Sequence, residues 1–246
     1  TNTGFVSASA EWVQVTQYAI KLARETHGAF DPTVRPLVDL WGFYRKQNQS
    51  VPNNAEIQNA LKIIGADQIE TSGGDQIAKR HPEASLDLSA VAKGYGVDEL
   101  LQECLMASFR DVYVEIGGEI RTHGNAPGDG HWKIAIEAPQ RGAALGENEY
   151  VRITLQDRAL ASSGDYRNYF ESAGQAYSHI IDPRTGFPVT NGVAAASVIA
   201  PHCMHADALA TALMVLGPQE GLSLSEQLPE TEALIIVRDA QGELSD

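Results

Sequence analysis

The densest group of chemically active side chains lies in residues 177–188. His179 is the strongest candidate for proton transfer, because a histidine with an ordinary pKa of about 6.5 can gain or lose a proton near neutral pH. Asp182 and Arg184 follow it, in a segment where two prolines and a glycine favour a turn. Reactive side chains on a loop anchored by a strand are a common way to build a site. An ordinary surface turn, with Asp182 paired to Arg184, explains the same residues and stays open on this pattern alone.

A second candidate lies near the carboxyl end, where Asp207 and Thr211 are four residues apart in a predicted helix. That spacing puts both side chains on one helix face. A carboxylate and a hydroxyl are hard oxygen donors, which suit Mg²⁺ and do not suit zinc. The competing interpretation is a polar stripe in which the Thr211 hydroxyl bonds to a carbonyl of its own helix.

The third candidate is residues 87–96, which are predicted to join a strand to a helix. Backbone N–H groups at the start of a helix favour anions, and Lys93 adds a positive charge one turn into it. Asp87 alternates with Leu86 and Leu88 and is expected to point away from them. A capped helix with a solvated lysine accounts for the same pattern.

Two further polar bends, residues 117–119 and 162–167, contain glycines that would let backbone approach a ligand. Ordinary turns explain each of them equally well. The histidines form no metal-binding spacing, and His202 and His205 flank Cys203 without a fourth donor nearby. Cys104 lacks a CxxC partner, so a disulfide to Cys203 and two free thiols both remain possible.

The elements that must position these residues indicate a mixed α+β fold, with packed helices between groups of strands and no regular βαβ alternation. Helical periodicity and end signals predict helices at residues 11–27, 53–64, 89–105 and 206–216. Ser89 is the expected cap of the third of these. Alternation and β-branched content predict strands at residues 85–88, 112–116, 132–136, 151–155, 180–181, 193–200 and 233–237.

Composition limits the classes of function. The chain has 246 residues, 43% hydrophobic and 20% charged, which is ordinary for a globular protein. Its formal net charge of −14, with no basic cluster, argues against nucleic acid as a partner. The longest apolar stretches are too short or too interrupted to span a bilayer. The chain starts at Thr1, directly before a helix, and we expect an amino-terminal segment to be missing.

Seven motifs, taken together and in order, closely resemble the ApbE family of FAD:protein FMN transferases. They occupy residues 28–34, 40–43, 86–95, 117–119, 163–167, 177–186 and 206–213, and so cover nearly the whole chain. The resemblance implies one ApbE-like, T-fold-like domain over residues 1–246. It also implies FAD as substrate, Mg²⁺ as cofactor, and transfer of FMN to a threonine or serine hydroxyl of a partner flavoprotein, with release of AMP.

The same resemblance assigns roles to individual residues. The flavin nucleotide pocket would use Ala29, Phe30, Asp31, Asp87, Lys93 and Ile181. The metal would be held by the backbone carbonyl of Ala90 and the side chains of Asp207 and Thr211, and His179 would be the general base. Two positions depart from the family pattern: Ala210 stands where some relatives have a carboxylate, and Ser162 where threonine is frequent.

Two other functions use the same residues: an FAD pyrophosphatase that releases FMN and AMP to water, and an FAD-binding protein without turnover. Retention of His179 and of both side-chain metal ligands counts against the second. The resemblance further implies an acceptor in a membrane redox complex of the NADH:quinone oxidoreductase type. It implies a location in the bacterial periplasm or cell envelope, with a lipid anchor on the full-length protein.

Overall fold

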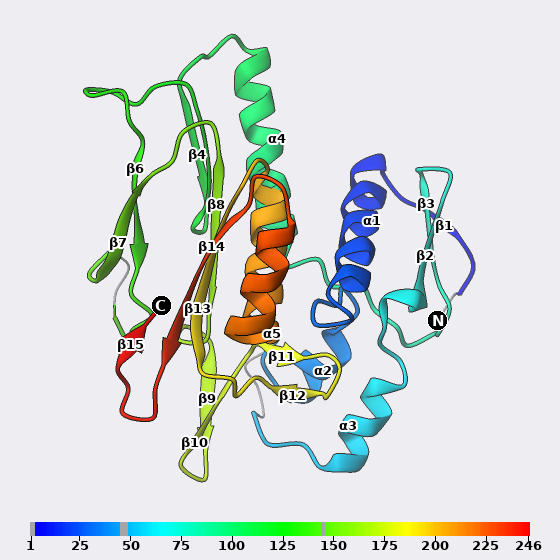
Figure 1. Cartoon of the computed structure of the whole chain (residues 1–246). Coiled ribbons are helices and arrows are strands. Elements are labelled where there is room, and N and C mark those ends of the chain that lie inside the picture. Colours follow the sequence, from blue (N-terminus) through cyan, green and yellow to red (C-terminus); the bar gives the residue numbers. More distant parts are fainter. Residues whose placement is uncertain (1–2, 45–48, 144–145) are drawn as a thin grey trace. The chain divides into compact units, whose positions relative to one another are not determined.

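The computed structural model (Figure 1) describes residues 3–44, 49–143 and 146–246. The chain divides into two compact units. Unit 1 contains residues 1–89 and 168–190, and unit 2 contains residues 90–167 and 191–246. Among the described residues all strand pairs are antiparallel, as expected for a chain without βαβ alternation. The mixed helix-and-sheet fold class predicted from the sequence is confirmed.

Unit 1 consists of short helices and small sheets. Its helices are α1 (Ala10–Glu25), α2 (Arg35–Leu40), α3 (Asn54–Leu61) and the 3-10 turn η1 (Ala66–Gln68). One sheet has the order β1-β3-β2, formed by Val6–Ser7, Gln76–Lys79 and Ile69–Ser72. Two hairpins complete the unit: β9 (Tyr169–Ser172) with β10 (Gln175–Ser178), and β11 (Ile181–Asp182) with β12 (Phe187–Pro188).

An aromatic and aliphatic core holds unit 1 together. Trp41 is fully buried and lies 5.4 Å from the ring of Tyr177, and its indole N–H donates to the Gly186 carbonyl at 2.9 Å. The cluster also includes Leu37, Phe43, Ile57, Ala60, Ile64, Phe170 and Ile181. The turn that follows His179 is therefore fixed to the core of its unit by packing and by a buried hydrogen bond.

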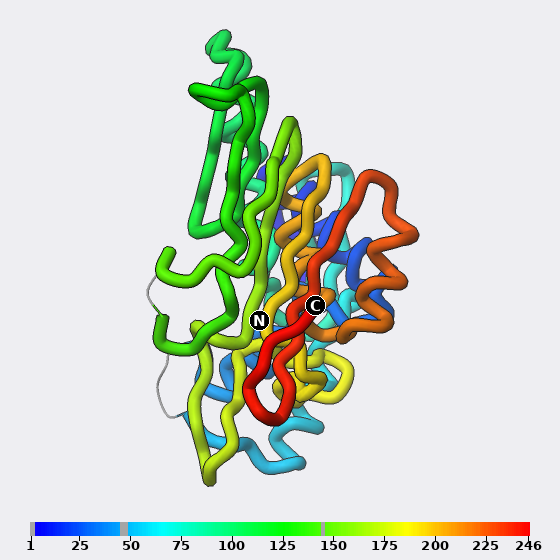
Figure 2. Tube along the Cα trace, turned by 60° about the vertical axis from the view of Figure 1, so that its left-hand side comes forward, coloured from blue at the N-terminus to red at the C-terminus, as the bar shows by residue number. Residues whose placement is uncertain are grey.

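Unit 2 is built on a six-stranded sheet with the order β15-β14-β13-β8-β5-β4. Figure 2 shows β14 in red beside β13. The strands are β4 (Val112–Ile116), β5 (Glu119–His123), β8 (Ala159–Gly164), β13 (Val193–Ala200), β14 (Glu232–Arg238) and β15 (Leu244–Ser245). β6 (Lys133–Glu137) and β7 (Glu149–Thr154) form a separate hairpin.

Two helices pack in unit 2. α5 (Cys203–Gln227) lies on β13 and β8, and α4 (Ala92–Met106) packs against α5 and β4 (Figure 1). Seven of the eight residues of β13 are buried, and the stretch from Ala206 to Ala210 is buried completely. Because β13 and this part of α5 are buried against each other, their side chains are mainly apolar, and both elements are visible as apolar stretches in the sequence.

Several predicted elements are confirmed with shifted ends, two predictions are wrong, and one is right only in part. Residues 85–88 form no strand: the Asp87 N–H donates instead to the Pro32 carbonyl at 2.6 Å. Ser89 is not a helix cap, since α4 starts at Ala92 and its N-cap position, Val91, makes no side-chain cap. The bend predicted at residues 162–167 is confined to residues 165–167, because residues 162–164 belong to β8, where pairing with β13 overrides their serine and glycine composition.

The helix predicted to end at residue 216 continues past a break. Gly217 has φ +80° and ψ 178°, a conformation that interrupts the helix, and Pro218 starts a second helical segment that runs to Gln227. Pro218 suits that first-turn position because its missing N–H would have had no partner there. Gly217 and Pro218 thus mark a break in the helix, as predicted, and no local pattern indicates that a helix restarts after it.

Candidate functional site

An aspartate on each of the helices α4 and α5 accepts hydrogen bonds from backbone N–H groups at the amino-terminal end of the other helix. Asp207 on α5 accepts a hydrogen bond from the Gly94 N–H in the first turn of α4, at 2.9 Å. Asp98 on α4 accepts from the N–H groups of Cys203 and Met204 at the start of α5, at 2.9 and 3.0 Å. Each helix therefore satisfies first-turn donors of the other, which are orphaned in an isolated helix.

Gly94 is required by this crossing. A Cβ at that position would lie 2.3 Å from the Cys203 carbonyl oxygen and 2.8 Å from Cβ of Asp207. No side chain tolerates such contacts without moving the backbone of α5. The glycine after Lys93 therefore brings the two helix starts close enough for the Asp207 carboxylate to reach the α4 backbone.

Asp207 is held in an unusual electrostatic state. Its side chain is 3% exposed, and burial raises its pKa to about 6, an effect that the Gly94 hydrogen bond and nearby Lys93 only partly oppose. The negative charge of Glu119 adds to the rise. A buried carboxylate with so little compensation is a good candidate for a cation ligand.

Thr211 lies one helical turn after Asp207, as predicted. Its hydroxyl is 3.0 Å from the hydroxyl of Ser163 on β8. The contact is thus to a neighbouring strand, which differs from the bond to its own helix that the competing interpretation required. Ser163 fixes the Thr211 side chain on the same helix face as Asp207.

Lys93 is paired with a residue that received no role from the sequence. Its Nζ lies 2.5 Å from Oε1 of Glu119, the first residue of β5. The Glu119 side chain is 3% exposed and that of Lys93 is 45% exposed. Burial raises the Glu119 pKa, and the Lys93 ammonium lowers it. The structure therefore brings three predicted site residues, Lys93, Asp207 and Thr211, into one region of unit 2. Ala90 lies three residues before Lys93 in the chain.

The remaining predicted residues belong to unit 1, where residues 29–31 and Asp87 lie together. Asp31 accepts from the backbone N–H and the hydroxyl of Thr33, at 2.7 and 2.6 Å, and burial raises its pKa. The hydrogen bond from the Asp87 N–H to Pro32 ties the two segments together. Ala29 and Phe30 are only 1% and 4% exposed.

His179 and Ile181 lie on either side of Ile180 in unit 1. The His179 Nδ1 is 3.1 Å from the Asn168 carbonyl oxygen, and its ring meets the Phe43 ring edge-on. Ile181 is 5% exposed and packs in the unit 1 core. The turn after them is the surface turn that the alternative interpretation expected: the Arg184 guanidinium makes two hydrogen bonds to Asp182, at 2.9 and 2.8 Å.

No group of three or more His, Cys, Asp and Glu that could hold a metal occurs among the described residues. The oxygen set of Ala90, Asp207 and Thr211 contains one carboxylate, so a cation there would need further donors from its ligand. Cys104 and Cys203 are both free thiols, and burial raises the pKa of Cys203. In the part of the chain that the structure describes, no helix is long and apolar enough to cross a bilayer.

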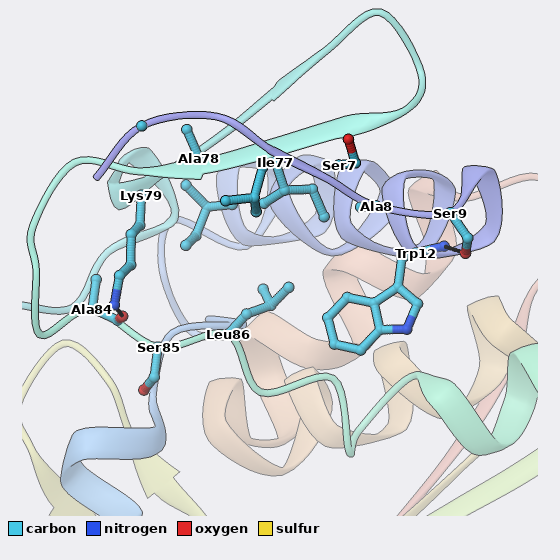
Figure 3. A pocket seen from close by; sticks show the side chains of 13 residues that line it. Ser7, Ala8, Ser9, Trp12, Ile77, Ala78, Lys79, Ala84, Ser85 and Leu86 are labelled. Atoms are coloured by element: carbon cyan, nitrogen blue, oxygen red, sulfur yellow. Dashed lines mark hydrogen bonds between the residues drawn. The ribbon is translucent and has the colours of Figure 1, made fainter. Parts of the chain in front are cut away.

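A cavity of about 710 Å³ lies elsewhere in unit 1, between β3, the start of α1 and residues 84–86 (Figure 3). Trp12, which is 56% exposed, borders it together with Ile77, Lys79 and Leu86. None of the predicted site residues lines it. Its lining is mainly apolar, and the ammonium of Lys79 is engaged by the carbonyl oxygens of Pro82 and Ala84.

Sequence reasoning missed Glu119, Asp98 and Ser163 as residues that shape the site. Glu119 had a visible signal, since a carboxylate follows two glycines and begins a strand whose next residue, Ile120, is buried. Ser163 was noted within a motif without a role. Asp98 gave no local signal, because the backbone groups that it caps are 105 and 106 positions away.

Comparison with known proteins identifies the family. The ApbE family profile matches residues 1–235. The chain belongs to the ApbE family. It is 41% identical over 240 residues to the FAD:protein FMN transferase of Vibrio cholerae, covering 96% of this chain and 70% of that protein. The corresponding protein of Haemophilus influenzae is 37% identical, with 95% of this chain and 68% of the relative covered.

Solved structures of ApbE proteins have the same fold. A histidine-to-glycine mutant of the flavin transferase ApbE from Vibrio cholerae superposes with a TM-score of 0.86 at 40% identity, covering 100% of this chain and 77% of that one. The apo form of the Pseudomonas stutzeri flavinyl transferase ApbE gives a TM-score of 0.85 at 34% identity, covering 99% and 74%. The family resemblance carried by the seven motifs is confirmed.

Proposed function

We propose that this chain is an FAD:protein FMN transferase, which moves FMN from FAD to a threonine or serine hydroxyl of a partner flavoprotein. The observation that carries the proposal is the 41% identity, over 96% of the chain, to a protein of that name. The residues that the family resemblance assigned to the reaction occupy the positions described above. FAD pyrophosphatase and FAD storage remain the competing functions.

The reaction breaks the phosphoanhydride bond of the FAD pyrophosphate and forms a phosphoester bond to the acceptor. The acceptor hydroxyl oxygen forms a bond to the phosphorus on the FMN side of the FAD pyrophosphate, and the bond from that phosphorus to the bridging oxygen breaks. AMP leaves with the bridging oxygen, and the hydroxyl proton passes to a base. The chain must therefore hold the pyrophosphate, balance its charge and accept one proton.

His179 is the proposed base, and its surroundings in unit 1 favour the necessary tautomer. The Asn168 carbonyl, 3.1 Å from Nδ1, can only accept a hydrogen bond. In the neutral ring this places the proton on Nδ1 and makes Nε2 the basic nitrogen. Edge-on contact with Phe43 further restricts the ring. These two contacts within unit 1 thus hold the ring so that Nε2 can act as the base.

Lys93 is the proposed contact for the pyrophosphate, because its ammonium is partly exposed at the start of α4, where backbone N–H groups also favour anions. The donor set of Asp207, Thr211 and the Ala90 carbonyl fits Mg²⁺ in type, being entirely oxygen. Its single carboxylate fits a cation whose remaining ligands are phosphate oxygens and water. When bound, Mg²⁺ would supply neutralisation of phosphate charge.

The acceptor and the location are proposals that rest on the family alone. We propose an acceptor flavoprotein subunit of a membrane redox complex of the NADH:quinone oxidoreductase type. We also propose a periplasmic or envelope location, with lipid attachment of the full-length protein. Incubation with candidate acceptor subunits and envelope fractionation of the expressing bacterium test the two separately.

Mass spectrometry after incubation with FAD, Mg²⁺ and an acceptor protein tests the reaction. Addition of FMN mass to the acceptor supports transfer, free FMN with AMP supports hydrolysis, and unchanged FAD supports storage. His179→Ala is expected to bind FAD and to lose transfer by about 10²–10⁴-fold. The exposed His131→Ala is a matched control that should transfer normally. Undiminished transfer by His179→Ala would remove that residue from the mechanism.

A further inference from the structure

The Lys93–Glu119 pair has a geometry that an ordinary surface ion pair lacks. Its two members are very unequally exposed: 45% for the Lys93 side chain and 3% for that of Glu119. Lys93 therefore reaches from the solvent side to a carboxylate inside the unit, at 2.5 Å. This contact holds the Lys93 ammonium in place, and the exposed part of the side chain remains accessible to a ligand.

The carboxylate itself is rigidly mounted. Glu119 follows the turn at Gly117 and Gly118 and opens β5, where it pairs in register with Ile116 of β4. β5 lies between β8 and β4 in the six-stranded sheet. Glu119 pairs with β4, and the next residue, Ile120, pairs with Leu160 of β8, so the strand that carries the carboxylate is held in the sheet and places Oε1 for Lys93.

The surroundings of the second carboxylate oxygen of Glu119 make the contact with Lys93 harder to break. Oε2 is buried and has no hydrogen-bond partner among the described residues. Lys93 consequently provides the only hydrogen bond to this carboxylate from a side chain in the described part of the protein. If Lys93 swung away, a buried carboxylate would lose its main compensation, which is strongly unfavourable. The pair is therefore far less free to open than an exposed one.

We propose that Glu119 is a positioning residue, which holds the Lys93 ammonium in place for the phosphates of FAD. This inference rests on the proposed function, because it assigns Lys93 to the FAD pyrophosphate. Pre-positioning reduces the conformational entropy that a long lysine side chain loses when it binds an anion. Glu119 acts only through Lys93 and needs no contact with FAD of its own.

The proposal predicts an effect opposite in sign to simple electrostatics. Removing a negative charge next to an anion site should strengthen anion binding if charge alone matters. Removing the tether should weaken it. Glu119→Met fills a similar volume without an acceptor, and we expect about tenfold weaker FAD binding, within the usual range of coupling between contacting residues. Glu119→Gln keeps a neutral acceptor for Lys93 and should recover part of the loss.

A double-mutant cycle on FAD binding, followed by calorimetric titration with Mg²⁺ present, tests the proposal. Glu119→Met should weaken binding about tenfold when Lys93 is present and less than twofold when Lys93→Met is present. Glu115→Gln, an exposed carboxylate of the adjoining strand, controls for the charge change. Thermal melting of each variant identifies any loss of folding.

The outcomes separate this inference from the proposed function. Equal weakening in both Lys93 backgrounds would make Glu119 a merely structural residue and overturn the proposal, as would tighter binding by Glu119→Met. Absence of FAD binding by the unmutated chain would instead count against the proposed function. A non-additive cycle with partial recovery in Glu119→Gln is the result expected.

Discussion

Asp98 and Asp207 are buried aspartates on the same pair of helices, and they are balanced very differently. Asp98 accepts hydrogen bonds from two backbone N–H groups and forms an ion pair with Arg121 at 2.7 Å. Asp207 accepts one from Gly94, and its pKa is raised to about 6 by burial. The fully compensated carboxylate stabilises the fold, whereas the under-compensated one is available to a ligand. Burial alone would not have separated the two roles.

Removal of Asp98 should give the largest change in stability. Asp98→Ala leaves Arg121, whose side chain is 12% exposed, without its partner and uncaps the start of α5. We expect the free energy of unfolding to fall by about 3–5 kcal/mol, the usual cost of breaking a buried pair. Urea denaturation measures the change. Asp129→Ala, which removes an exposed ion pair, is the control and should cost less than about 1 kcal/mol. Equal losses of unfolding free energy in the two variants would show that the buried Asp98 pair stabilises the fold no more than an exposed ion pair does.

The pH dependence of stability should reveal the opposite state of Asp207. Its folded pKa of about 6 lies above the ordinary 3.8, so between these values the folded state keeps a proton that the unfolded state has lost. The Asp207 contribution to stability is therefore complete below about pH 4 and is lost as pH rises to about 6, by about 3 kcal/mol in total.

Denaturation in EDTA, compared with Asp207→Asn, measures this contribution. The difference in unfolding free energy between the two proteins should change across that window and be flat above it. Addition of Mg²⁺ should stabilise the unmutated protein more at pH 7 than at pH 5, because a cation competes with the proton. A difference that does not vary with pH would contradict the assigned state of Asp207.

For flavin transfer, in contrast to stability, a change at Asp207 should matter more than a change at Asp98. Asp207→Asn removes a predicted metal ligand, and we expect flavin transfer to fall about 100-fold, equivalent to about 2.7 kcal/mol, with no loss of stability. Transfer is followed by mass spectrometry over a range of Mg²⁺ concentrations. Asp129→Asn, which is exposed, should transfer normally. Full activity of Asp207→Asn in EDTA would remove the metal from this position.

The contrast also explains what could be predicted from the sequence. The seven motifs located His179, Lys93, Asp207 and Thr211, because the chain order of short motifs is readable without knowing which of them meet. Strand β13 and helix α5 were found because their residues are apolar along their length. The family and fold class are confirmed, and the roles of individual site residues and the single domain over residues 1–246 stay predictions.

What escaped prediction depends on partners far away in the chain. The capping by Asp98 requires backbone groups 105 residues later, and β8 is a strand because β13 and β5 pair with it. The absent strand at residues 85–88 is the converse case. Its alternation was visible, but the Asp87 N–H found the Pro32 carbonyl rather than a neighbouring strand. Local pattern predicts propensity, and distant pairing decides the outcome.

The smallest expected effect concerns the orientation of the proposed second ligand. The hydroxyl of Ser163 lies 3.0 Å from that of Thr211, whereas the neighbouring Ser162 bonds to Ser197 on β13 at 2.7 Å. These two serines alternate along β8, so they offer the same chemical change on opposite faces of one strand.

Ser163→Ala should therefore free the Thr211 side chain and weaken the apparent affinity for Mg²⁺ about tenfold, at the low end of the cost of losing a residue that orients a ligand. Ser162→Ala should leave that affinity within twofold. Mg²⁺ titrations of FAD binding and of flavin transfer provide two independent measurements. If both serines gave the same result, the Thr211 side chain would not depend on Ser163, and Asp207 would be the one residue left in the contrast with Asp98. A selective effect of Ser163 would extend the proposed metal site from α5 to β8.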